Sequence, residues 1–270
     1  MTAKPEHNSA LRGILPLCGV AICVGIWETN SHFRLYQVIA PSLSPAAFPS
    51  FFSIVGHLND LLRSAEFWKA VGLTVARTLS AFGIAAFFGT LLGLLAGRVR
   101  LMAAIVQLPV EFFRNLPAIA AMPIFILFLG IGTPMKVALC VFGALFPIFI
   151  ATRMAIENIS EDIHIVARFY GWRGWRLVFM VLLPSALPEI AAASQTALAI
   201  SLILAVMGEM LIGGDGIGSM IVDSERTFNH LELYALVLAL GVVGTLIAFG
   251  LRRSASHLIF WKKAINWQQS

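Results

Sequence analysis

Three ionisable side chains stand inside or beside long apolar stretches of the sequence, and they are its clearest candidates for chemistry. Glu111 and Arg114 lie one helical turn apart within Leu101–Gly130, and Glu209 directly follows the charge-free run Ile190–Gly208. An ionisable group in an apolar segment is costly unless it pairs with another charge or faces a polar cavity. We therefore expect Arg114 either to serve a functional site or to pair with Glu111. Glu209 either faces an external partner or caps a helix.

Metal and covalent chemistry find no support in the sequence. The cysteines Cys18, Cys23 and Cys140 show no C-x-x-C spacing, and the six histidines form no H-E-x-x-H pair. Asp215 stands in the glycine-rich run Gly213–Gly216 and is expected to be a turn residue rather than a ligand. The absence of a Gly-Lys dipeptide excludes a P-loop, and no G-x-S-x-G motif occurs. We predict no metal site, no cofactor, no catalytic residue and no enzyme activity.

The composition is that of a membrane protein. Hydrophobic residues make up 59% of the 270 residues, charged residues make up 12%, and the mean hydropathy is +0.85. Soluble domains have roughly 45–50% apolar and about 25% charged residues. The net charge of +5 is not gathered into a basic run or stripe, so the sequence does not indicate nucleic-acid binding.

The candidate side chains must be positioned by membrane-spanning helices, each of which needs about 20 largely apolar residues. We predict an all-α, polytopic membrane bundle of about six spans. No small-x-small cleavage site follows the first span, so we expect it to be retained rather than removed as a signal peptide. The spans are Gly13–Trp27, Thr78–Gly97, Leu101–Gly130, Val137–Thr152, Ile190–Gly208 and Leu233–Leu251.

Prolines interrupt the third span. Pro109, Pro117 and Pro123 exclude a straight helix over Leu101–Gly130. The carbonyl groups that these prolines leave free must be satisfied by a neighbouring helix or by a cavity. The second span differs, because Gly89, Gly93 and Gly97 recur every four residues and leave one helix face without side chains. That face predicts close packing against another helix.

The region between the first two spans is rich in proline and serine, which breaks any long helix. We predict an external connection there, with a short interfacial helix over Pro45–Arg63. The chain then divides into an N-terminal helix with this connection (1–70), a core of spans (71–253) and a C-terminal tail (254–270).

Lys and Arg residues predict the orientation, because they are enriched in cytoplasmic loops. Most of them fall on the side that holds both termini and the loop Arg153–Arg176, whereas Lys136 falls on the other side. We therefore predict that both termini and this loop are cytoplasmic.

The predicted cytoplasmic loop contains a short amphipathic helix. Ile163, Val166, Ala167 and Tyr170 fall at i, i+3, i+4 and i+7, which predicts one apolar stripe. Gly171 can end this helix in a left-handed turn. The helix either lies on the membrane surface or docks against a cytoplasmic partner.

This loop resembles that of binding-protein-dependent ABC transporter permeases, written E-A-A, three residues, G, nine residues, I-x-L-P. The residues that fit this spacing are Ala167, Gly171, Val181, Leu183 and Pro184. Further segments, within about 66–253, resemble the nitrate/sulfonate/taurine branch of the family. They are Thr74 with Arg77, Pro117 with Pro123, Phe128–Gly132 with Lys136, Ser185–Pro188, Glu209–Leu211 and Gly216–Gly218. One departure is Ile165, which stands where the family has its glutamate.

The resemblance implies a MetI-like permease fold with a coupling helix, in the bacterial cytoplasmic (inner) membrane. The implied partners are a second, usually identical permease subunit, two cytoplasmic ABC ATPase subunits that hydrolyse ATP, and an external substrate-binding protein. The implied solute is a small anion, and Arg114 suits an anion in transit. The expected ATPase-coupling residues are Glu161, Ile163, Val166, Ala167, Tyr170, Gly171, Trp172, Arg173 and Pro184. The expected residues of the translocation path are Arg114, Pro117 and Glu209.

Two other functions compete with the importer. An ion-coupled secondary transporter typically shows inverted repeats and paired interrupted helices, whereas this sequence shows one broken span and no evident repeat. A regulatory membrane subunit remains open, because transport itself leaves no pattern in a sequence.

Overall fold

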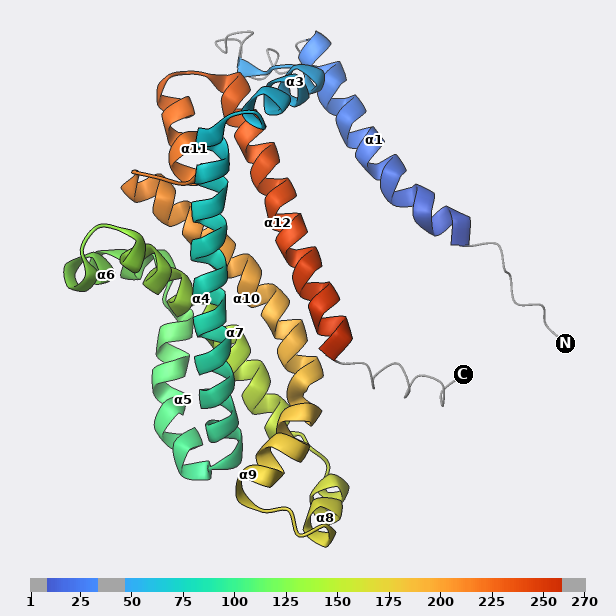
Figure 1. Cartoon of the computed structure of the whole chain (residues 1–270), viewed down its shortest axis with the longest axis vertical. Coiled ribbons are helices and arrows are strands. Elements are labelled where there is room, and N and C mark those ends of the chain that lie inside the picture. The colour runs from blue at the N-terminus through green and yellow to red at the C-terminus, as the bar shows by residue number, and fades with distance from the viewer. Residues whose placement is uncertain (1–8, 34–46, 259–270) are drawn as a thin grey trace, which may run out of the picture. The chain divides into compact units, whose positions relative to one another are not determined.

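The protein is described by a computed structural model that covers residues 9–33 and 47–258 (Figure 1). All regular secondary structure within these residues is helical, and none of them forms a strand. The chain divides into two compact units, which are described separately. One unit holds residues 1–65 and 221–239, and the other holds residues 66–220 and 240–270.

The first unit is built around α1 (Ser9–Phe33) and α3 (Phe51–Leu61). The Ser50 hydroxyl caps α3 by accepting a hydrogen bond from the Ser53 amide. The Trp27 ring stacks on Phe48 with ring centroids 4.4 Å apart, and its indole N–H donates to the Pro49 carbonyl. The short helix predicted over Pro45–Arg63 is therefore present as the shorter α3, and its place at the membrane interface stays a prediction; residues 34–46 lie outside the described part of the chain.

The second unit contains the long apolar helices. They are α4 (Ala65–Arg98), α7 (Thr133–Glu157), α10 (Leu183–Ile212) and α12 (His230–Leu258). α4 and α12, together with the shorter α11 (Ile217–Arg226), cross the boundary between the units. Among the described residues, four helices are long and apolar enough to span a membrane, and a bent pair gives a fifth. The bundle of apolar helices is thus confirmed, whereas a total of six spans remains a prediction.

The third predicted span is broken, as its prolines require. α5 (Arg100–Asn115) ends just before Pro117, and a short 3₁₀ turn, η2 (Ala118–Ala121), leads into α6 (Met122–Leu129). The two halves are bent by 99° relative to each other. Pro123 starts α6, where its missing N–H costs no helical hydrogen bond.

The glycine face of α4 packs against α7. A Cβ atom on Gly93 would lie 2.6 Å from the Phe149 carbonyl oxygen and 2.7 Å from the Thr152 Cβ. Gly89 and Gly97 are also crowded by α7, whose nearest atoms lie 3.0 Å and 2.8 Å from the Cβ positions of these two glycines. The predicted close helix contact is therefore confirmed, and α7 is the partner.

α7 also packs along α10, and these two helices enclose most of the core of this unit. Ala144 and Ile148 of α7 and Ala186 and Ala197 of α10 are completely or almost completely buried in one cluster. Small side chains on both helices permit a close approach, as is usual for helices in membranes. The helix pair therefore connects the two ends of the unit rigidly.

Candidate functional site

The loop between α7 and α10 folds as the sequence predicts. α8 (Glu161–Phe169) carries Glu161 and Asp162 in its first turn and Arg168 in its last, which complements the helix dipole. Gly171 has φ +68°, and its amide donates to the Arg168 carbonyl at 3.0 Å. The Trp172 amide donates to the Ala167 carbonyl, also at 3.0 Å. These two bonds form a Schellman motif, which needs a left-handed residue where Gly171 stands.

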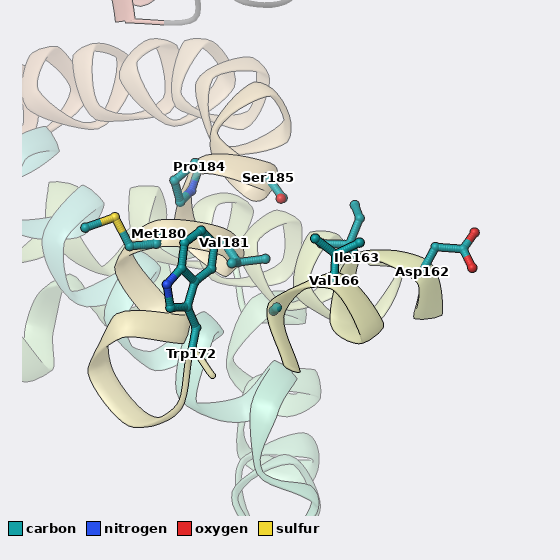
Figure 2. Close-up of a pocket in the computed structure, with 9 residues that line it drawn as sticks. Asp162, Ile163, Val166, Trp172, Met180, Val181, Pro184 and Ser185 are labelled. Carbon is teal, nitrogen blue, oxygen red and sulfur yellow. The ribbon is translucent and has the colours of Figure 1, made fainter. Parts of the chain in front are cut away.

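A groove of about 500 Å³ lies between α8 and the start of α10 (Figure 2). Ala167 is buried at its base, whereas Val166 remains 51% exposed. The lining residues are Asp162, Ile163, Val166, Ala167, Trp172, Met180, Val181, Pro184 and Ser185. The apolar stripe of α8 therefore faces an open, mostly apolar groove.

Pro184 is accommodated by an irregular turn. The helix that ends at Ile212 begins with α9 (Gly174–Leu177) and η3, a π-helical turn over Val178–Leu182. A proline inside a regular helix clashes with the carbonyl four residues earlier, and the wider turn relieves that contact. The π-turn and Pro184 both lie at the groove, so the irregularity is placed at the candidate site.

The remaining predicted coupling residues lie on the solvent side of the same loop. The Tyr170 ring is 69% exposed and stacks on Trp172 with ring centroids 5.1 Å apart. Glu161 and Arg168 approach to 3.4 Å, but both are largely exposed, so the pair contributes little stability. Arg173 is exposed as well. All nine predicted coupling residues thus lie on or next to one loop.

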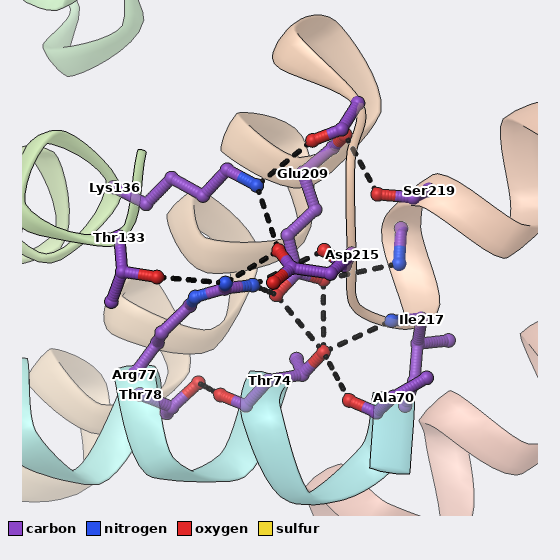
Figure 3. A network of polar contacts seen from close by, with 12 residues as sticks. Ala70, Thr74, Arg77, Thr78, Thr133, Lys136, Glu209, Asp215, Ile217 and Ser219 are labelled. Atoms are coloured by element: carbon purple, nitrogen blue, oxygen red, sulfur yellow. Dashed lines mark hydrogen bonds and ion pairs between the residues drawn. The ribbon is translucent and has the colours of Figure 1, made fainter. Parts of the chain in front are cut away.

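A second site, which is polar, lies where α4, α7 and the end of α10 meet (Figure 3). Its charged members are Arg77, Lys136, Glu209 and Asp215, which we call the ionic cluster. Glu209 is completely buried, and its Oε1 lies 2.8 Å from Arg77 Nη1. A buried carboxylate needs such a partner together with further hydrogen bonds.

Those further hydrogen bonds come from Thr74 and from the start of α11. The Thr74 hydroxyl lies 2.9 Å from Glu209 Oε2, and the Gly218 amide donates to the same oxygen at 3.1 Å. The Ile217 amide donates to the Thr74 hydroxyl oxygen. Glu209 therefore caps α11, and the positive end of that helix dipole stabilises its charge. The sequence predicted two alternative roles for Glu209. Capping of a helix is confirmed, whereas contact with an external partner is wrong, because the side chain is completely buried.

Asp215 completes the ionic cluster from the turn between α10 and α11. Its Oδ1 lies 2.5 Å from Arg77 Nη2 and 3.4 Å from Lys136 Nζ. Burial raises the pKa of this carboxyl, but the hydrogen bond and charge of Arg77, aided by Lys136, outweigh it and lower the pKa. Asp215 is therefore a turn residue, as predicted, and also an ion-pair partner, which was not predicted.

The structure corrects the place assigned to Lys136. The Lys/Arg distribution placed it on the external side, just before the span Val137–Thr152, but it lies in the first turn of α7 and is almost completely buried. Its ammonium group donates to the Gly213 carbonyl at 3.0 Å. The signal that could have revealed the cluster is the balance of charges, because Arg77, Lys136 and Glu209 each lie in or next to an apolar segment and each needs a partner.

Arg114 lies at the break between α5 and η2. It lines a cavity of about 470 Å³ together with Asn115, Phe142 and Phe146. Glu111 instead accepts a hydrogen bond from Gln107, and no ion pair joins Glu111 to Arg114 in the described structure. Pro117 is exposed next to this cavity, whereas Glu209 is held in the ionic cluster. The three residues predicted for the translocation path are therefore not brought together.

No group of three or more His, Cys, Asp and Glu side chains within the described residues is placed to hold a metal ion. The candidate sites are instead the mostly apolar groove at α8, the ionic cluster and the cavity beside Arg114.

Comparison with known proteins identifies the family. Residues 89–260 match the family described as "Binding-protein-dependent transport system inner membrane component". The aliphatic sulfonates transport permease SsuC of Escherichia coli K12 is 30% identical over 217 residues, which cover 80% of each chain. The nitrate import permease NrtB of Leptolyngbya laminosa is 28% identical over 231 residues, covering 84% of this chain and 80% of NrtB.

Solved structures agree on the fold. The permease chain of a bacterial alginate ABC transporter, crystallised with its periplasmic protein, has a TM-score of 0.61 at 16% identity and covers 94% of this chain and 97% of that one. An inward-facing MetNI methionine ABC transporter gives a TM-score of 0.60 at 21% identity, covering 70% of this chain and 94% of the other. The chain belongs to the family of binding-protein-dependent transport system inner membrane components and is a permease subunit of an ABC importer, a transport component and not an enzyme.

Proposed function

We propose that this permease imports a small oxyanion such as a nitrate, sulfonate, taurine or bicarbonate. The relatives are named for sulfonate, nitrate, taurine and bicarbonate transport. Arg114 at the broken third span supplies a positive charge beside a cavity that is otherwise lined mainly by apolar side chains. A guanidinium group that forms no ion pair with residues 9–33 or 47–258 can attract and orient an oxyanion in such a place.

The observation that carries the proposed assembly is the open groove on the α7–α10 loop. Its apolar side chains, Val166 among them, are exposed in the isolated chain although they form a concave surface. We propose that a cytoplasmic ABC ATPase subunit covers this surface, and that α8 is the coupling helix. Movement of the ATPase would then reach the rest of the bundle through α10, which starts at the groove.

The charge distribution supports an orientation in the membrane, and we propose cytoplasmic termini and a cytoplasmic α8. We also propose a second identical permease subunit and an external binding protein that delivers the solute, which the description of the family as binding-protein-dependent supports. The division into residues 1–70, 71–253 and 254–270 belongs to the same proposal.

A matched pair of substitutions on α8 tests the coupling role. Val166 lines the groove, whereas its neighbour Ile165 is 40% exposed and is not part of the groove lining. Val166→Glu places a charge in the apolar groove, so we expect it to abolish co-purification of the ATPase and ATP-driven uptake in proteoliposomes. Ile165→Glu adds the same charge outside the groove and should leave both intact. Equal behaviour of the two variants would contradict the proposal.

The solute class is tested by uptake of radiolabelled taurine, methanesulfonate and nitrate. Arg114→Gln should reduce uptake of these anions at least tenfold while ATPase co-purification persists. Arg252 is exposed in α12, and Arg252→Gln serves as the control for loss of one positive charge. Uptake that is unchanged by Arg114→Gln would remove this residue from the pathway.

A further inference from the structure

Asp215 is the only charged member of the ionic cluster that solvent reaches. Its side chain is 47% exposed, whereas the Arg77, Lys136 and Glu209 side chains are at most 3% exposed. The Asp215 carboxylate therefore stands between two buried cations and the solvent. Any group that replaced this carboxylate would meet both cations at once.

The turn that carries Asp215 consists largely of glycine. Gly213, Gly214 and Gly216 all have positive φ, and a Cβ atom on Gly213 or Gly214 would meet nothing within 4 Å. The backbone is held separately, because Arg77 Nη1 donates to the Asp215 carbonyl at 3.1 Å and Lys136 donates to the Gly213 carbonyl. The carboxylate adds a further restraint through its contacts with Arg77 and Lys136, so its departure loosens the turn without releasing it.

The position that the carboxylate would vacate is lined by donors. Arg77 Nη2 and Lys136 Nζ both point to Asp215 Oδ1 (Figure 3). Arg77 Nε is buried and finds no hydrogen-bond partner in the part of the chain that the structure describes, so the guanidinium group has an unused donor there. Such a buried, unpartnered donor is uncommon in proteins, and it indicates a site that is not filled by the chain itself.

The balance of charge requires an anion at this position. Without the Asp215 carboxylate, Glu209 is the one anionic partner of Arg77 among the described residues, and its oxygens are already engaged by Arg77, Thr74 and Gly218. The other partners of Arg77 and Lys136 are neutral oxygens of Thr133, Asp215 and Gly213. A buried net positive charge is strongly unfavourable, so a new anion must take the place of the old one.

We propose that Arg77 and Lys136 form a binding site for a small oxyanion, and that Asp215 occupies this site in the absence of that anion. Sulfate, nitrate and sulfonates have the flat or tetrahedral oxygen arrangement that a guanidinium and an ammonium group bind together. The choice of these anions rests on the proposed function, but the binding itself can be measured on the permease alone.

Binding of methanesulfonate to the purified permease in detergent is the first test, measured by isothermal calorimetry at constant ionic strength. Asp215→Ala removes the internal competitor and should bind methanesulfonate at least tenfold more tightly than the wild type. The double variant Asp215→Ala/Lys136→Gln should lose this gain. Asp223→Ala, which removes an exposed carboxylate from a 4.0 Å pair with Arg226, is the charge control and should match the wild type.

Hydrogen exchange of the wild-type protein tests whether Asp215 really leaves the site. Added methanesulfonate should increase amide exchange in the turn 213–216, because the displaced carboxylate no longer restrains it. The proposal is overturned if Asp215→Ala gains no affinity, if the gain survives Lys136→Gln, or if the anion leaves exchange in the wild-type turn unchanged. None of these outcomes affects the ATPase contact, which the Val166→Glu variant tests independently.

Discussion

Arg77 Nη1 and Glu209 Oε1 lie 2.8 Å apart, although the two residues are separated by 132 positions in the sequence. Both side chains are almost or completely buried, and they join α4 to the last turn of α10. Thr74 and the start of α11 bind the same carboxylate. One residue, Glu209, therefore fixes the positions of three helices.

We predict that Glu209→Gln strongly destabilises the protein. The substitution leaves the buried Arg77 and Lys136 with a single carboxylate, Asp215, to balance two positive charges, and removing one partner of a buried pair costs about 3–5 kcal/mol. Thermal unfolding in detergent measures the loss. The control is Glu157→Gln, since Glu157 pairs with Arg153 at 2.7 Å in a partly exposed i, i+4 pair that is worth at most about 1 kcal/mol. If the two variants melted at the same temperature, the ionic cluster would not be a stabilising element.

The contact between α4 and α7 leads to a second prediction. Gly93→Ala places a methyl group 2.6 Å from the Phe149 carbonyl oxygen, and the helices must separate to admit it. We expect a loss of about 1–3 kcal/mol, which is typical of overpacking. Gly83→Ala is the matched control on the same helix, because its Cβ would meet nothing within 4 Å. It should be neutral or stabilising in thermal unfolding, since alanine favours helix more than glycine does. If Gly93→Ala unfolded at the same temperature as Gly83→Ala, the close contact between α4 and α7 would be excluded.

Local patterns in the sequence predicted these elements well. The helix of Glu161–Phe169, the left-handed Gly171 and the break at Pro117 each depend on residues within a few positions of one another. Helical periodicity and the restricted backbone of proline act over that range, so the sequence contains the whole signal. The glycine face of α4 was predicted for the same reason, but its partner α7 was not.

The ionic cluster depends on contacts that no local pattern encodes. Arg77 was recognised only as a family-like residue, Glu209 was expected to face an external partner or to cap a helix, and Lys136 was placed on the external side. Their meeting is set by how α4, α7 and α10 pack, and the sequence does not specify that packing through spacing. The predicted pair of Glu111 and Arg114 shows the converse. Helical spacing permits this contact, but Glu111 accepts a hydrogen bond from Gln107 instead.

The turn after α8 gives a third prediction. Gly171 has φ +68°, and a Cβ atom there would meet no neighbour, so any cost of substitution comes from the backbone conformation alone. Gly171→Ala should lower stability by about 1–2 kcal/mol, while Gly171→Asn should be milder because asparagine tolerates the left-handed region. Circular dichroism melting of the two variants measures the difference. If alanine and asparagine proved equal, the Schellman turn would not require a left-handed residue.

The last prediction concerns the dependence of stability on pH through Asp215. Its pKa is lowered in the folded protein from the ordinary value of 3.8, because the hydrogen bond and charge of Arg77 outweigh the effect of burial. A lowered pKa means that the folded state favours the ionised form, so the contribution to stability is complete above the ordinary pKa. It is lost as the pH falls through the lowered pKa of the folded state. Because the side chain is half exposed, solvent screening keeps this contribution modest.

Unfolding of the wild type and of Asp215→Asn by denaturant, measured from pH 8 downwards, tests this dependence. The wild type should be more stable by a constant margin at neutral and weakly acidic pH, and the margin should shrink only below about pH 4. Asp223→Asn is the matched control, since Asp223 is exposed and lies 4.0 Å from Arg226. The difference in stability between the wild type and Asp223→Asn should be close to zero at every pH. A margin for Asp215→Asn that grew as the pH fell would have the wrong sign and would show that Arg77 does not stabilise the ionised carboxylate.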